Sequence, residues 1–304
     1  MKEWRVVGEG AAHVVIGGGV EDLEVYRVSK DWASLTKKDV ERTVAFHTNF
    51  VRKYFVGFVH DQKVSELPSA LAAQLVHTSK PIPCVKTKNL IGPCCVELKP
   101  KYPSVDGIPT HFVLKQKGES SVFDPQDLFR DGGDIPQTLH SAYLHPKKYL
   151  KIHNRGKFDT EWLMRSTAKL LATPPMRDLF KRIQSLQRFG ADAFAPTARR
   201  LYELLGTEAD RLECVDVFED FDEFASTSYT GILPQLATKW LNTFLAGRMV
   251  RDVSLLINFS DSPGDCPGGL PSVQLAPSVY ASVGMVDTDL KPRSKIFEYA
   301  PHSS

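Results

Sequence analysis

Residues 4–16 read WRVVGEGAAHVVI, two strand-like runs on either side of a stretch of small residues. The turn signal Gly17-Gly18-Gly19 follows, and residues 23–28, LEVYRV, alternate as a half-buried strand does. The start of the chain therefore predicts a β-rich unit. Small residues at 8–12 would let backbone N–H groups approach a phosphate chain closely, because no side chain blocks them. A plain hairpin turn explains the same residues, and no Walker A lysine follows them.

Composition and charge are those of a globular protein with a sizeable core. The chain has 304 residues, 42% of them hydrophobic, enough for one large core or two lobes. Lys and Arg number 38 against 36 Asp and Glu, so a site for a strongly anionic ligand must come from local clustering. We find neither a run of about 18 apolar residues, as a membrane span needs, nor a signal-peptide segment. Five cysteines without a CxxC pair lead us to expect reduced thiols, in the nucleus or the cytoplasm.

The rest of the chain predicts a mixture of helices and strands. Hydrophobic spacing predicts helices at residues 37–55 (with Thr36 as cap), 69–77, 176–189, 196–205 and 234–249. Short apolar runs predict strands at residues 94–98, 253–259 and 280–286. Prolines and lysines punctuate residues 79–93, which we interpret as a hinge or linker. The pattern predicts an α+β fold with a small β-rich N-terminal part and a larger, helix-rich C-terminal part.

A basic segment follows the predicted strand at 94–98. Residues 96–101 read VELKPK, and in an extended chain Glu97, Lys99 and Lys101 share one face because side chains alternate. Glu97 is the only acid between residues 79 and 101, a stretch that also holds three further lysines. The segment is either a solvated strand end or part of an anion-binding site.

Carboxylates also lie at the ends of two other apolar runs, after the end of one run and at the start of the other. Residues 283–292, VGMVDTDLKP, place Asp287 and Asp289 at the end of a strand. Phosphoryl transfer needs carboxylate oxygens for Mg²⁺ and cations for the phosphates, and three basic residues follow by position 295. A charged turn is the alternative. Asp252 begins the run at 253–259, where a strand-edge salt bridge would explain it equally well.

Taken in order, these segments resemble the inositol pentakisphosphate 2-kinase family. Residues 8–12 resemble its glycine-rich loop, with His13 for the usual Asn, and residues 96–101 resemble its EIKPK signature, with Leu98 for Ile. Residues 287–292 resemble its DLDLKP segment. Weaker matches lie at residues 123–129, 149–152 and 252–257. The matches run from residue 8 to about residue 299, nearly the whole chain.

The resemblance implies a fold and an activity. The fold is bilobal and kinase-like, with ATP between an N-lobe, residues 1–92, and a C-lobe, residues 93–304. The activity is ATP- and Mg²⁺-dependent phosphorylation of the 2-hydroxyl of inositol 1,3,4,5,6-pentakisphosphate, which gives inositol hexakisphosphate (phytate). We expect no nucleic-acid or membrane partner, a monomer, and a location in the nucleus or cytoplasm.

The resemblance also implies roles for individual residues. Lys99 would steady the transferred γ-phosphoryl group, and Asp252 would orient or deprotonate the 2-hydroxyl. Asp287 would hold Mg²⁺, with Asp289 close by. The nucleotide contacts would be Gly8, Glu9, Gly10, Ala11, Ala12, His13, Arg27 and Asn89. The substrate-phosphate contacts would be Lys101, Lys117, Lys148, Lys151, Lys291, Lys295 and Tyr299.

Departures from the family pattern leave alternatives open. Residues 110–116 and the pair Lys148-Tyr149 replace a family RFxMHQ-like stretch and a paired Asn. A kinase for another inositol phosphate is therefore the first alternative. A non-catalytic inositol phosphate sensor is the second, although a pure binder would not need the metal-holding carboxylates. Some members carry a zinc site, but Cys214 and Cys266 lack partners at ligand spacing, so we predict no structural zinc.

Overall fold

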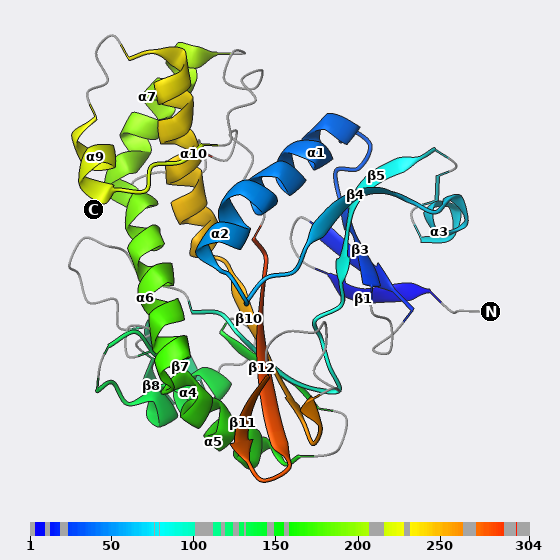
Figure 1. The fold of residues 1–304 in the computed structure, drawn as a ribbon, viewed down its shortest axis with the longest axis vertical. Helices are drawn as coiled ribbons and strands as arrows, with labels where there is room; N and C mark the ends of the chain where they lie inside the picture. Colours follow the sequence, from blue (N-terminus) through cyan, green and yellow to red (C-terminus); the bar gives the residue numbers. More distant parts are fainter. Residues whose placement is uncertain are drawn as a thin grey trace. The chain divides into compact units, whose positions relative to one another are not determined.

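The computed structural model describes the chain except for a set of short segments and the C-terminal residues. The residues outside the description are 1–3, 10–12, 19–23, 76, 79, 101–111, 117–118, 124–127, 131, 145–148, 155–157, 207–215, 228–231, 264–271, 289–295 and 297–304. The described residues form two five-stranded sheets, a two-stranded sheet and a set of helices (Figure 1). The α+β class is therefore confirmed.

Contacts within the chain divide it into two compact units. The first consists of residues 1–95, 153–155 and 256–284, and the second of residues 96–152, 156–255 and 285–304. Strands β6, β9, β10 and β12, whose bounds are given below, each contribute residues to both units. The division into lobes at residue 92 stays a prediction.

The first sheet is antiparallel and has the order β1-β2-β3-β5-β4. Its strands are β1 (Arg5–Glu9), β2 (His13–Gly17), β3 (Glu24–Ser29), β4 (Gln62–Leu67) and β5 (Ile82–Lys88). The register places Gly8, Val15, Arg27 and Val85 directly opposite one another across four strands. Because facing residues project to the same side of a sheet, Arg27 and Gly8 share a face.

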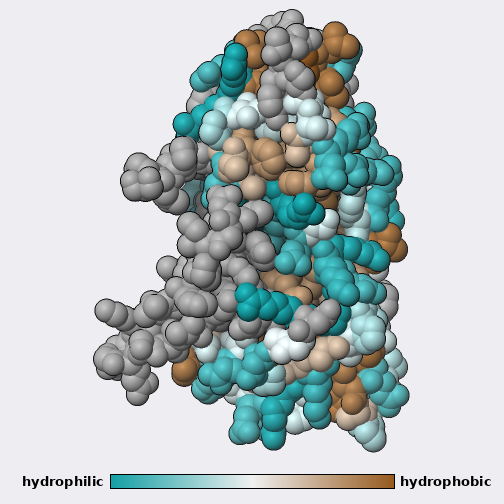
Figure 2. All heavy atoms as spheres, turned by 90° about the vertical axis from the view of Figure 1, so that its left-hand side faces the viewer, coloured by the Kyte–Doolittle hydropathy of each residue, from teal (hydrophilic) through white to brown (hydrophobic). Residues whose placement is uncertain are grey.

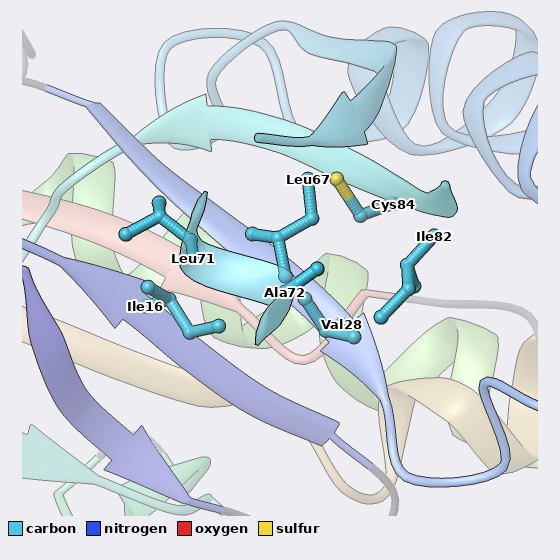
Figure 3. Packing of buried hydrophobic residues seen from close by; sticks show 7 residues of the cluster. All are labelled: Ile16, Val28, Leu67, Leu71, Ala72, Ile82 and Cys84. Atoms are coloured by element: carbon cyan, nitrogen blue, oxygen red, sulfur yellow. The ribbon is translucent and has the colours of Figure 1, made fainter. Parts of the chain in front are cut away.

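An apolar cluster covers part of the other face of this sheet. Helix α3 (Ser69–Leu75) brings Leu71 and Ala72 onto side chains from β2, β3, β4 and β5 (Figure 3). The strand members of the cluster are Ile16, Val28, Leu67, Ile82 and Cys84. They alternate with residues of the Arg27 face, so the hydrophobic period seen in the sequence fixes which side of the sheet is packed.

Helix α1 (Lys37–Phe46) begins at a capping box. The Thr36 hydroxyl accepts from the Asp39 N–H, and the Asp39 carboxylate accepts from the Thr36 N–H at 2.9 Å. A π-helical stretch (His47–Val51) and α2 (Arg52–Tyr54) continue it, which confirms the helix predicted at residues 37–55. Apolar side chains that set the helical spacing, including Val40, Phe50 and Phe55, are buried, and α1 packs on β4 and β5.

The interpretation of residues 79–93 as a linker is wrong. Residues 82–88 form β5, which lies between β3 and β4 in the first sheet. The prolines in this stretch suggested a linker, but Pro83 lies within β5, where it pairs only with Glu66 of β4, and the pairing of β5 with β3 begins at Val85. On the β3 side Pro83 therefore occupies a position like that of an edge strand, where its missing N–H costs no ladder bond.

The second five-stranded sheet has the order β11-β12-β10-β6-β9. Its strands are β6 (Cys94–Leu98), β9 (Leu150–Asn154), β10 (Ser254–Ser260), β11 (Ser272–Ala276) and β12 (Val279–Val286). The predicted strands at 94–98, 253–259 and 280–286 are thus confirmed as β6, β10 and β12. Strands β7 (Phe112–Gln116) and β8 (Glu119–Phe123) pair separately as an antiparallel hairpin.

Helices dominate the second unit. They are α4 (Ile135–Leu144), α5 (Thr160–Leu171), α6 (Pro174–Phe189), α7 (Ala195–Leu205), α9 (Phe221–Ser226) and α10 (Pro234–Val250). The helices predicted at 176–189, 196–205 and 234–249 are confirmed. Helix α10 is buried nearly all round and packs on α6 and α7 (Figure 1). Its Trp240 stacks on Phe224, with ring centroids 4.6 Å apart, and donates from Nε1 to the Phe224 carbonyl.

Among the described residues, no helix is both long and apolar enough to span a membrane. The face drawn in Figure 2 carries mainly hydrophilic side chains, with hydrophobic ones in smaller patches. That mixture is ordinary for the surface of a folded protein.

Candidate active site

Four neighbouring strands of the second sheet bring charged and hydroxyl side chains together. Asp287 follows β12, Ser254 begins β10, Glu97 lies in β6 and Lys99 comes just after it, and Lys151 lies in β9. This is also the order of the strands in the sheet, so the side chains form a row across it. All five residues belong to the second unit. We call these five residues the carboxylate–lysine cluster.

Glu97 is the central residue of the carboxylate–lysine cluster. Its Oε1 lies 4.0 Å from the Lys99 Nζ, and its Oε2 lies 3.6 Å from the Lys151 Nζ. Only 15% of its side chain is exposed, against 50% for Lys151. A carboxylate at this depth needs paired charges, and it holds both ammonium groups at the sheet surface.

Lys99 joins Glu97 to Asp287. Its Nζ lies 3.8 Å from the Asp287 Oδ2, and its own backbone N–H donates to the Tyr149 carbonyl at 2.7 Å. That hydrogen bond ties Lys99 to the start of β9 although it lies beyond the end of β6. The predicted shared face of Glu97 and Lys99 is confirmed, while Lys101 lies outside the described residues.

Ser254 lies between the two carboxylates. Its hydroxyl is 3.1 Å from the Glu97 Oε1 and 3.2 Å from the Asp287 Oδ2, and the residue is fully buried. A serine hydroxyl has one proton, so it donates to one carboxylate at a time. The hydroxyl therefore fixes the separation of two negative charges that would otherwise repel each other.

The backbone at Asp287 is in the left-handed region, with φ 62°. This conformation is uncommon for a residue with a Cβ, although Asp tolerates it better than most. It follows directly on the extended chain of β12, so the chain turns sharply where the carboxylate begins. With 46% of its side chain exposed, the Asp287 carboxylate is the more accessible of the two acids.

The donor set of the carboxylate–lysine cluster is suited to Mg²⁺ held together with phosphates. Mg²⁺ in phosphoryl-transfer sites takes one or two protein carboxylates and completes its shell with phosphate oxygens and water. Asp287 supplies one exposed carboxylate and Glu97 a second, more buried one. Within the described part of the chain no group of three or more His, Cys, Asp or Glu forms a cage able to hold a metal by itself.

Asp252 lies in the short connection between α10 and β10, two residues before Ser254. It is half-buried, and its backbone N–H donates to the Met249 carbonyl at 2.9 Å. This hydrogen bond anchors the connection to the end of α10. The part proposed for Asp252 in handling the 2-hydroxyl stays a prediction.

The predicted nucleotide contacts that are described lie in the first unit. Gly8 and Glu9 end β1, His13 begins β2, Arg27 lies in β3, and Asn89 follows β5. Lys30 pairs with Glu9 at 2.6 Å and holds the pKa of the Glu9 carboxyl below its usual value. The Asn89 Oδ1 accepts from the Ile91 N–H at 3.2 Å. Strands β1 and β2 form the two arms of the hairpin that was predicted around residues 8–12.

Many predicted site residues lie outside the described part of the chain, and their roles stay predictions. They are Gly10, Ala11, Ala12, Lys101, Lys117, Lys148, Asp289, Lys291, Lys295 and Tyr299, together with Cys214 and Cys266.

Two members of the carboxylate–lysine cluster were given no role by sequence reasoning. Glu97 was seen on the same face as Lys99, and that alternation was the signal that could have identified it as the partner of the lysine. Ser254 gave no such signal, because its position between the acids depends on β10 lying between β12 and β6.

Comparison with protein families gives a match that covers most of the chain. The family model for inositol-pentakisphosphate 2-kinase matches residues 7–302. No match was found among curated proteins. The matching model covers nearly the whole chain, and its family consists of phosphotransferases that act on inositol phosphates. The carboxylate–lysine cluster lies within the matched residues, and the chain belongs to the inositol-pentakisphosphate 2-kinase family.

Proposed function

We propose that this protein transfers the γ-phosphoryl group of ATP to the 2-hydroxyl of inositol 1,3,4,5,6-pentakisphosphate and so makes inositol hexakisphosphate. Membership of the family supports an inositol phosphate kinase. The observation that carries the proposal further is the Lys99 ammonium, 3.8 Å from the Asp287 carboxylate. A cation for a phosphoryl group thus lies beside a carboxylate for a metal, as phosphoryl transfer requires.

In the proposed reaction the cluster positions and neutralises charge. Mg²⁺, when bound, would supply positive charge that offsets the negative charge of the phosphates. Asp287 would hold that ion through its exposed oxygen, and the Lys99 ammonium would bind the oxygens of the transferred group. Glu97 would keep the Lys99 side chain directed along the sheet surface. No covalent enzyme intermediate is needed, because positioning and electrostatic stabilisation supply most of the rate in such reactions.

Asp252 is the proposed acceptor of the substrate proton. The 2-hydroxyl oxygen would attack the γ-phosphorus, the bond from that phosphorus to the β-phosphate oxygen would break, and ADP would leave. The hydroxyl proton would pass to the Asp252 carboxylate. The half-buried position of Asp252, two residues before Ser254 of the carboxylate–lysine cluster, supports this role.

Nucleotide contacts are proposed for the first sheet. Gly8 has no side chain on the face that it shares with Arg27, so a phosphate chain could approach the backbone there. Arg27 would then supply a planar cation suited to phosphate oxygens. His13, Glu9 and Asn89 complete the proposed nucleotide set.

The test is a phosphate-transfer assay with ATP, Mg²⁺ and inositol 1,3,4,5,6-pentakisphosphate, resolved by ion-exchange chromatography. We expect inositol hexakisphosphate from the parent chain. We expect Asp287→Ala and Lys99→Ala to lower kcat by about 100-fold or more, the usual loss when one electrostatic contact to a transition state is removed. Glu203→Ala and Lys181→Ala are the matched controls, because both side chains are exposed on helices of the same unit.

Two results would overturn the proposal in different ways. If the product carries the new phosphate at another position, or if only a different inositol phosphate is turned over, the proposed substrate or position is wrong. The protein is then still an inositol phosphate kinase. Tight binding of the pentakisphosphate without transfer would replace the kinase by a sensor.

We also propose that the protein works in the nucleus or the cytoplasm. Cys84 and Cys94 are buried free thiols, as is common in reducing compartments. Burial raises the pKa of the Cys84 thiol to about 12, so it stays protonated and unreactive. Microscopy of the fluorescently tagged chain checks the location. Secretion of the tagged protein would contradict the proposal.

A further inference from the structure

The first unit contains a cavity that the proposed reaction does not use. It has a volume of about 370 Å³ and lies where β3, β4 and β5 meet the chain between α2 and β4 (blue to cyan in Figure 1). That volume is within the range of small-molecule sites. Most of the charged side chains that line it are basic: Arg52, Lys63, Lys86 and Lys88.

The sheet register concentrates three of these cations on one face. Lys63 of β4 is directly opposite Lys86 of β5, and Lys88 follows Lys86 by two residues and so projects to the same side. Like charges directly opposite each other in antiparallel strands are unfavourable. A fold that keeps such a pair at the wall of a cavity is suited to an anion between the two charges.

The carboxylates in the cavity offset only part of this charge. Glu24 pairs with Lys86 at 2.7 Å, and Asp61 pairs with Arg52 at 2.8 Å. In the described part of the chain the Lys63 ammonium has no ion pair. Four basic and two acidic side chains line the cavity, which leaves a formal charge of +2 when His60 is neutral.

His60 supplies an uncharged polar group to the same cavity. Its Nε2 is buried and has no hydrogen-bond partner among the described residues. Burial, reinforced by Lys88, lowers the pKa of His60, so the ring is neutral at pH 7. A buried polar atom without a partner costs free energy that a ligand oxygen would recover.

The cavity is separate from the predicted nucleotide contacts on the same sheet. Tyr26 is opposite Lys86 in the register, and the Lys86 ammonium lies 5.8 Å from the centre of the Tyr26 ring. Arg27 follows Tyr26 in the strand and therefore projects to the opposite face. The lysines of the cavity are thus directed away from the Arg27 side.

We propose that this cavity is a second anion site, which takes a soluble small molecule carrying several phosphate groups, of the class to which inositol polyphosphates belong. Lys63 and Lys86 bind one phosphate group between them, and Arg52 and Lys88 reach a second. The ammonium and guanidinium groups donate charge-assisted hydrogen bonds, which are the strong contacts to phosphate. Because a site of this kind can bind substrate or product of an inositol phosphate kinase, it offers a place for regulation apart from the carboxylate–lysine cluster.

Titration calorimetry of the full chain with inositol hexakisphosphate tests the proposal, at about 0.15 M salt so that unspecific attraction is screened. We expect two binding events in the parent. Lys63→Glu should weaken one event about ten-fold or more and leave the other, and the phosphate transfer without added hexakisphosphate, unchanged. This variant replaces a like-charge cross-strand pair by an opposite-charge pair, so its fold is retained.

Two further variants make the result decisive. Lys181→Glu, the same charge change on an exposed lysine of α6, should leave both events unchanged. Lys99→Ala should weaken only the event at the carboxylate–lysine cluster, which separates this proposal from that of the catalytic function. A single binding event that Lys63→Glu does not alter would overturn the second site, as would an equal loss in Lys181→Glu.

Discussion

At the scale of the residue, the buried hydroxyl of Ser254 controls the distance between two carboxylates. Without it, Glu97 and Asp287 face each other with only Lys99 between them. We expect Ser254→Ala to lower kcat about ten-fold and to raise the Mg²⁺ concentration needed for half-maximal rate, because one hydrogen bond to a charged group is worth about 1.5–3 kcal/mol. Ser254→Thr keeps a hydroxyl and should retain most of the activity.

The control for this prediction is another buried serine. The Ser282 side chain is 1% exposed, and its hydroxyl has no hydrogen-bond partner among the described residues. Ser282→Ala should leave both the Mg²⁺ dependence and the stability nearly unchanged. If Ser254→Ala lowers the melting temperature but leaves the Mg²⁺ concentration for half-maximal rate unchanged, Ser254 contributes to packing only and does not position the carboxylates.

The same residues show what sequence alone could predict at this scale. Glu97 and Lys99 are two apart in a strand, so their shared face followed from alternation. Contacts between Lys99 and Asp287, or Ser254 and Asp287, join residues more than 30 positions apart. They depend on the order of β12, β10 and β6 in the sheet, which no local pattern contains. Resemblance to the family assigned Lys99 and Asp287, but only the sheet places them side by side.

At the scale of the element, the packing of α6 against α10 depends on two glycines. A Cβ on Gly190, just after α6, would lie 2.5 Å from the Gly247 carbonyl carbon in α10, and a Cβ on Gly247 would overlap the Gly190 backbone. Neither neighbour is a flexible side chain that could move aside. The two backbones therefore approach as closely as they do because neither residue has a side chain.

Gly247→Ala tests this contact by the sign of its effect. Helix propensity alone would make alanine at this position more stable by up to about 1 kcal/mol. The overlap should reverse that gain and destabilise the protein by about 1–3 kcal/mol, the usual cost of overpacking. Urea denaturation followed by Trp fluorescence measures the change. If Gly247→Ala instead raised the free energy of unfolding, α10 could move away from Gly190 without loss of stability, and the prediction would be wrong.

Elements also differed in how well their sequences predicted them. The helices α6 and α10 were predicted from hydrophobic spacing, which is a local signal, and each has a proline in its first turn. Strand β5 was missed because Pro81 and Pro83 resemble punctuation in a linker. Pairing with β4 stabilises β5 as a strand despite these prolines. Strand β4 pairs with β5 along its whole length, while β3 pairs with β5 only from Val85 onward. A partner strand elsewhere in the chain thus decided an element that its own sequence left ambiguous.

At the scale of the whole molecule, two half-buried titratable groups, His60 and Asp192, make stability depend on pH. Burial lowers the pKa of His60, with help from Lys88. At Asp192 burial alone would raise the pKa, but the Arg248 and Arg251 guanidinium groups, 2.6 and 3.3 Å from Oδ1, outweigh it and lower the pKa. In both cases the folded protein binds a proton less readily than the unfolded chain does.

The sign of the effect follows from this difference in proton binding. When the folded pKa is the lower one, the unfolded state takes up protons first as the pH falls, so the free energy of unfolding falls with pH. For His60 this stability is complete above its ordinary pKa of 6.5 and is lost as the pH falls through the lower folded value. For Asp192 the loss begins near the ordinary 3.8 and continues below it.

Urea denaturation between pH 7.5 and pH 3 should therefore show two separate declines in stability. His60→Gln should flatten the free energy of unfolding between about pH 7 and pH 5 and leave the acid decline in place. Asp192→Asn should lower stability throughout, because Arg248 is only 8% exposed and loses its counter-charge, and should flatten the decline below about pH 4. The comparison rests on the slopes, so the lower stability of Asp192→Asn does not disturb it. Equal slopes for the parent and His60→Gln near pH 6 would mean that His60 titrates in the folded protein as it does in the unfolded chain, and that burial at the second anion site does not keep its ring neutral.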